Sequence, residues 1–70
     1  MFNNNLRRLR TEAGLSQLEL SRRTRIAPAD LCSLETGKRF AYAGWRQRIA
    51  QALGQPVDTI FPEDKATVSR

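Results

Sequence analysis

Apolar residues recur along this chain at the spacing of helix faces. Leu6, Leu9 and Ala13 lie three and four residues apart with arginines between them, which predicts an amphipathic helix over residues 5–13. The same reasoning predicts further helices over residues 17–23, 28–35 and 45–53, and a last short helical turn over residues 57–61. The sequence therefore predicts an all-α protein.

Capping and helix-breaking residues separate these segments. Ser16 is expected to cap the helix over residues 17–23, and Glu19 completes the capping-box pattern three residues later. Residues 25–27 are expected to form a tight turn, because Pro28 suits the first position of a helix. The other boundaries are expected at Asn4 or Asn5, Gly14, Gly37, Gly54 and Pro56. Residues 38–44 then form a basic and aromatic loop.

One side of each predicted helix is apolar, and these sides are expected to meet in a single core. A chain of 70 residues has room for one small domain, which we place at residues 1–62, with a polar, flexible tail at residues 63–70. The expected core residues are Leu6, Leu9, Leu15, Leu20, Ile26, Leu31, Leu34, Ile49 and Leu53.

Composition and charge narrow the function. Twelve Lys and Arg against seven Asp and Glu give a net charge of +5, which attracts the phosphate backbone of nucleic acids. No apolar run approaches the roughly 20 residues of a membrane span, and the N-terminus does not resemble a secretory signal, so a cytoplasmic protein is expected. Cys32 is the only cysteine and there is no histidine, so we expect neither a disulfide, a metal site nor a cofactor.

Three sequence blocks carry a resemblance to a known family. They are Leu-Ser-Gln-x-Glu-Leu at residues 15–20, Leu-Glu-Thr-Gly-Lys-Arg at residues 34–39 and Ile-Ala-Gln-Ala-Leu-Gly at residues 49–54. With these blocks in register over residues 6–61, the chain resembles the Cro and lambda-repressor type, or XRE-type, of helix-turn-helix regulators. The resemblance implies a compact fold of five short helices, in which the second and third form the helix-turn-helix and the third lies in the major groove of DNA.

The resemblance also implies which residues touch DNA. The side chains expected to face bases are small and weakly hydrogen-bonding: Ala27, Pro28, Ala29, Cys32 and Ser33. Those expected near phosphates are Gln17, Lys38, Arg39, Tyr42 and Trp45. Ala29 suits a thymine methyl group and Ser33 suits several base edges, but none matches the strong bidentate pairs, so Arg39 and DNA shape are expected to contribute to specificity.

Several of these residues have a structural alternative. Lys38 and Arg39 also complement the dipole of the helix that they follow, Tyr42 also suits a loop aromatic that covers the core, and Trp45 is expected to pack its ring into the core. Ile60 and Phe61 are expected either at a dimer interface or at the end of the core.

Two positions bear on how the third helix is held. The resemblance implies an ion pair between Arg10 and Glu35, which would position the helix without touching DNA. It also implies glycine in the turn where this chain has Arg25, and a left-handed arginine costs roughly 1 kcal/mol.

We therefore expect a sequence-specific regulator that binds double-stranded DNA, as a dimeric repressor at a palindromic operator. No nucleophile with a base, carboxylate pair or phosphate-binding loop indicates an enzyme. The alternative is a protein-interaction module or an antitoxin, which would use the same fold to bind a protein partner.

Overall fold

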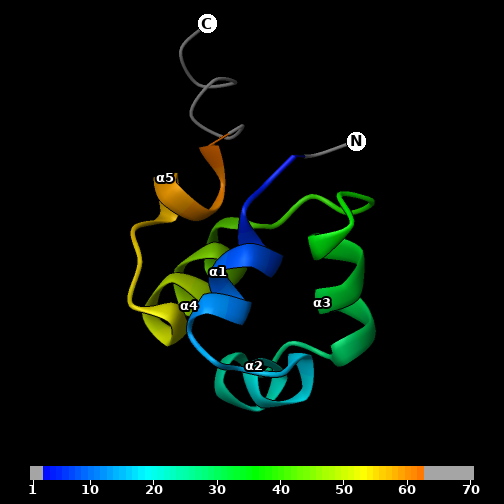
Figure 1. The fold of residues 1–70 in the computed structure, drawn as a ribbon. Coiled ribbons are helices and arrows are strands. Elements are labelled where there is room, and N and C mark those ends of the chain that lie inside the picture. Colours follow the sequence, from blue (N-terminus) through cyan, green and yellow to red (C-terminus); the bar gives the residue numbers. More distant parts are fainter. Residues whose placement is uncertain (1–2, 63–70) are drawn as a thin grey trace, which may run out of the picture.

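The computed structural model describes residues 3–62. It contains five helices and, within those residues, no strand (Figure 1), so the all-α prediction is confirmed. The helices are α1 (Leu6–Glu12), α2 (Gln17–Thr24), α3 (Pro28–Glu35), α4 (Ala43–Leu53) and α5 (Val57–Ile60). The predicted tail, residues 63–70, lies outside the described residues.

The helices surround one core in a single small bundle. In Figure 1, α1 crosses in front of α4, while α2, α3 and α5 lie around this pair. The pairs in closest contact are α2 with α4, α2 with α3, α4 with α5, and α1 with α3. Near the start of the described chain, the Asn5 backbone N–H donates to the Ile60 carbonyl at 2.8 Å. This contact ties α1 to α5.

The core is formed by the aliphatic residues that the helical spacing indicates. Eight of the nine expected core residues are buried, and Leu15 is half-buried and packs against their edge. Ala41, Ile60 and Phe61 complete the buried apolar set. Burying such side chains is the main stabilising contribution in a domain of this size, at about 1.5–3 kcal/mol for each large aliphatic.

Local interactions determine where the helices begin and end. The capping box of α2 is present: Ser16 Oγ accepts from the Glu19 backbone N–H at 3.0 Å, and Glu19 Oε1 accepts from the Ser16 N–H at 2.9 Å. At α1, Asn4 Oδ1 accepts from the Leu6 N–H at 3.0 Å, while the Asn5 side chain makes no capping hydrogen bond. The structure thus assigns the capping contact to Asn4.

The fourth helix is longer than the sequence indicated. It begins at Ala43, so Ala43 and Gly44 lie in its first turn rather than in the preceding loop. Tyr42, with extended backbone angles, is its N-cap and makes no side-chain capping bond. The apolar spacing starts only at Trp45, which explains why a pattern-based boundary falls too late.

Candidate nucleic-acid interface

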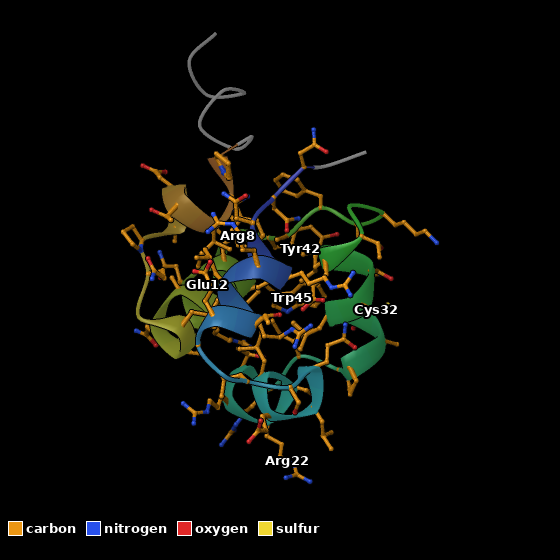
Figure 2. All side chains as sticks on the ribbon, viewed as in Figure 1. Arg8, Glu12, Arg22, Cys32, Tyr42 and Trp45 are labelled. Atoms are coloured by element: carbon orange, nitrogen blue, oxygen red, sulfur yellow. The ribbon has the colours of Figure 1, made fainter. Side chains whose placement is uncertain are left out.

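The third helix presents one side to the core and the other to solvent. Leu31 and Leu34 are fully buried, whereas the residues expected to face bases lie away from the core: Ala27, Pro28, Ala29 and Cys32 are exposed and Ser33 is half-buried. Figure 2 shows Cys32 on the side of α3 that points away from the other helices. This outer side, the α3 face, is free of bulky side chains.

The turn between α2 and α3 holds the α3 face in a fixed direction. Arg25 adopts the left-handed conformation with φ 60° and ends α2, as its position suggested. Ile26 is buried after it. Ser21 Oγ donates to the Ile26 carbonyl at 2.6 Å, and Thr24 Oγ1 donates to the Leu20 carbonyl at 2.8 Å. The first bond joins α2 to the turn, and the second lies within the last turn of α2.

Thr24 and Ser21 were not identified from the sequence as residues that form this turn. Thr24 is only 1% exposed, and its hydroxyl also accepts from the Ile26 N–H at 3.4 Å. Small hydroxyl side chains that bond back to the preceding turn are common at helix ends. The hydroxyl residues Ser21 and Thr24 near the end of the predicted helix were the sequence signal that could have indicated these bonds.

An ion pair fixes one flank of α3 to the rest of the domain. Arg10 Nε donates to Glu35 Oε2 at 2.6 Å and Arg10 Nη2 donates to Glu35 Oε1 at 3.3 Å. The same guanidinium donates through Nη1 to the Leu15 carbonyl at 2.8 Å. With side chains only 14% and 4% exposed, the pair is nearly closed to water. It joins α1 to the end of α3.

Gln17 takes part in this network. Its Nε2 donates to Glu35 Oε1 at 3.1 Å, and the residue is half-buried. The side-chain amide expected to approach a phosphate is therefore used inside the protein. Only the location of Gln17 in the first turn of α2, and not its side-chain amide, then favours an anion.

A second ion pair holds the opposite flank of α3. Arg39 Nη1 donates to Asp30 Oδ1 at 2.7 Å, and the Arg39 guanidinium carbon lies 5.7 Å from the centre of the Trp45 ring. The loop is folded back onto α3, because the backbone N–H groups of Lys38 and Arg39 both donate to the Ser33 carbonyl, at 2.9 and 3.3 Å. The sequence alone did not indicate that Asp30 pairs with Arg39.

Aromatic side chains lie beside this second pair. Tyr42 is 64% exposed and its ring meets Phe40 at 6.2 Å and Trp45 at 5.8 Å, both edge to face. Arg46 lies over the Phe40 ring at 5.0 Å. Trp45 is half-buried and packs against the core, while Tyr42 faces solvent rather than covering the core. Figure 2 labels both rings on the side of the domain near α3.

Positive charge dominates the described residues. Residues 3–62 carry ten basic and five acidic side chains, so the whole net charge of +5 belongs to them. Lys38 is exposed at the end of α3, and Figure 2 shows Arg22 extending outward from α2. The pKa of Glu19 is lowered, first by the Ser16 backbone hydrogen bond, then by the Ser16 hydroxyl and by the nearby Arg23 and Arg22.

Ile60 and Phe61, expected at a dimer interface or in the core, are both buried. Their side chains are 0% and 6% exposed, and the Ile60 carbonyl accepts from Asn5. They close the end of the core, so neither side chain is available to a second copy in this conformation. A dimer would have to use other, exposed groups.

Residues 3–62 contain neither of two features of other protein classes, a cluster of metal-ligating side chains and a long apolar helix. Among residues 3–62 no three His, Cys, Asp or Glu side chains gather as metal ligands would. None of the described helices combines the length and the apolar character needed to span a bilayer.

A comparison with protein families identifies the class. Residues 4–60 match the model of a family described as a helix-turn-helix domain. The chain belongs to this family, and the match includes α1 to α5 with the α2–turn–α3 unit at its centre. Membership indicates a DNA-binding regulator. No curated protein matches the chain.

Proposed function

We propose that this chain is a sequence-specific regulator of transcription that inserts α3 into the major groove of double-stranded DNA. The exposed α3 face carries this proposal, because the rest of α3 is fixed by the core and by two ion pairs. A rigid helix with one free side and a domain with a net charge of +5 suit a DNA groove.

Small side chains on the α3 face suit close approach. The Ala29 methyl group and the exposed Ala27 and Pro28 let the helix backbone come near the base edges. Ala29 is placed for a thymine methyl group, and the Ser33 hydroxyl for a base-edge donor or acceptor. Cys32 adds apolar contact on the same side. Sequence-dependent DNA shape then contributes part of the specificity.

The phosphate contacts are proposed at the edges of α3. Lys38 is exposed just beyond the end of the helix, and the N-terminus of α2 at Gln17 favours an anion. The first turn of α4 has no side-chain cap, which leaves the Trp45 backbone N–H for a phosphate. Tyr42, being largely exposed, adds a hydroxyl donor.

We further propose that the protein is a homodimeric repressor acting at a palindromic operator. One α3 face with small side chains makes few base contacts, and a second copy about 34 Å away on the same face of the duplex doubles them. Since Ile60 and Phe61 are buried, the dimer contacts must come from exposed side chains. Sedimentation over a concentration series, with and without operator DNA, tests this; monomers throughout would remove the dimer.

The test of DNA binding is a fluorescence-anisotropy titration against DNA from upstream of the gene and a scrambled duplex. The titration is repeated from about 50 to 200 mM salt, because charge-driven binding weakens steeply over that range. A preference for the upstream duplex that persists at the higher salt supports a sequence-specific regulator. Equal binding that fades with salt contradicts it.

Two substitutions separate base contact from phosphate contact. Ser33→Arg alters the α3 face and should change which sequences are preferred, whereas Lys38→Ala should weaken binding to all of them. If neither variant changes DNA binding, α3 does not dock as proposed.

Exposed apolar side chains favour one other function. Leu18, Phe40 and Tyr42 are 51%, 42% and 64% exposed, and such side chains are common at protein interfaces. A protein-interaction module is therefore the second candidate. Leu18→Ser would leave DNA binding unchanged and weaken capture of a protein partner if this candidate is correct.

A further inference from the structure

Both acidic side chains of α3 are neutralised by an arginine from outside the helix. Glu35 pairs with Arg10 of α1, and Asp30 pairs with Arg39 of the following loop. Unpaired carboxylates here would repel the phosphates that flank a groove. The two pairs differ in exposure: the first is nearly closed to water, whereas Arg39 and Asp30 are 48% and 37% exposed. Only the second pair is accessible to a ligand.

The Arg39 guanidinium is held in one orientation while most of its donors stay available. Asp30 Oδ1 takes one N–H from Nη1 at 2.7 Å, and the Trp45 ring lies 5.7 Å away. Of the five N–H groups of the Arg39 guanidinium, one donates to another side chain within residues 3–62. The backbone of Arg39 is bonded to the Ser33 carbonyl, so the side chain runs along the edge of the α3 face from Ser33 toward Asp30.

We propose that Arg39 reads a guanine in the major groove, with Asp30 as its positioning residue and the Trp45 ring as its support. Guanine presents two acceptors, O6 and N7, that match the planar fork of a guanidinium. The residues of the α3 face supply no such fork, so this contact would add the strong bidentate contact to a base that they lack. The proposal rests on the proposed DNA-binding function.

The surroundings of Arg39 favour a base edge over a phosphate. A phosphate is attracted mainly by net positive charge, and the Asp30 carboxylate, 2.7 Å from Arg39 Nη1, offsets the charge of this guanidinium and so weakens that attraction. Guanine is neutral, so the carboxylate imposes no such penalty. A phosphate contact also needs only a positive charge, whereas a bidentate base contact needs an oriented, planar group.

The test is a selection of preferred duplexes from a random library, carried out on the full chain with four proteins. They are the wild type, Arg39→Lys, Asp30→Asn and Lys38→Ala. Arg39→Lys keeps the charge and removes the fork, Asp30→Asn keeps the shape and removes the orienting charge, and Lys38→Ala is the control for a phosphate contact. Thermal unfolding of each variant checks that it is folded before selection.

The expected result is a guanine at one fixed position of the wild-type site. Arg39→Lys should lower the discrimination for guanine at that position, by at most the roughly 5- to 150-fold that a bidentate contact supplies, and leave the other positions unchanged. Asp30→Asn should lower it by a smaller factor, without weakening binding to duplexes that lack this guanine. Lys38→Ala should weaken binding to all duplexes alike and reduce the salt dependence of binding.

Two other results would overturn the inference without affecting the proposed function. If Arg39→Lys selects the same site with the same discrimination as the wild type, the planar fork of Arg39 does not read the guanine. If Asp30→Asn leaves the guanine discrimination unchanged while Arg39→Lys lowers it, Asp30 does not position the arginine. By contrast, a wild-type protein that selects no preferred duplex contradicts sequence-specific binding itself.

Discussion

Replacing Arg10 by Met tests how strongly the closed ion pair holds α3. The substitution keeps most of the side-chain length and removes the guanidinium, leaving the Glu35 carboxylate, only 4% exposed, with a single donor from Gln17 at 3.1 Å. The Leu15 carbonyl loses its side-chain donor as well. A buried charge stripped of its partner costs about 3–5 kcal/mol.

That loss is large for this protein. Native domains are stable by about 0.05–0.15 kcal/mol per residue, so a chain of 70 residues is expected to be stable by roughly 4–10 kcal/mol. Arg10→Met should therefore remove roughly a third or more of the free energy of unfolding. Urea denaturation, followed by helical circular dichroism and by Trp45 fluorescence, measures the change in the free energy of unfolding.

Two controls separate the buried charge from other effects. The double variant Arg10→Met, Glu35→Leu removes both charges and should recover to within about 2 kcal/mol of the wild type. Arg8→Met removes a pair with Glu12 on the same helix, where the side chains are 57% and 59% exposed, and should cost less than about 0.5 kcal/mol. If Arg10→Met costs no more than Arg8→Met, the Arg10–Glu35 pair does not hold α3 as argued.

Three further predictions concern local structure. Arg25→Gly removes the strain of an arginine in the left-handed conformation and should raise the free energy of unfolding by about 1 kcal/mol. Arg23→Gly, within α2, is the control and should lower the free energy of unfolding by a similar amount; urea denaturation measures both changes. Gly44→Ala places a methyl group in open space in α4 and should raise the free energy of unfolding by about 0.5–1 kcal/mol, which a thermal melt detects as a higher midpoint. The pKa of Glu19 is lowered, so its charge stabilises the fold above pH 4.5, and this contribution is lost as the pH falls. The difference in thermal stability between the wild type and Glu19→Gln should therefore shrink in acid. A series of thermal melts in which this difference stays constant with pH would contradict the prediction.

Local sequence signals were sufficient where the physics is local. The capping box at Ser16 and Glu19 depends on residues three apart, and the left-handed ends at Gly14 and Gly54 depend on the freedom of glycine. The family match then covers residues 4–60 and confirms the helix-turn-helix class that the three sequence blocks indicated.

Contacts between distant segments were harder to predict. Ile60 and Phe61 carried two interpretations, since an apolar side chain near the end of a domain suits a partner surface as well as a core. Their burial depends on how α5 packs against α4 and on the bond from Asn5, none of which is visible in local spacing. Gln17 is a similar case, because its bond to Glu35 joins positions 18 residues apart.

Helical periodicity and capping act over a few residues, so the five helices and the inward sides that form the core could be predicted from the sequence alone. The helix-turn-helix class followed from the resemblance of the three sequence blocks to a known family. How the charges on α3 are used depends on contacts between segments that are distant in the sequence. Glu35 is closed off by Arg10 and Gln17, while Asp30 orients an accessible Arg39 beside Trp45. The loop that folds back onto Ser33 and the packing of α1 and α2 against α3 bring these partners together. Because the partners come from separate segments, their contacts depend on the packing of the whole domain and not on local sequence.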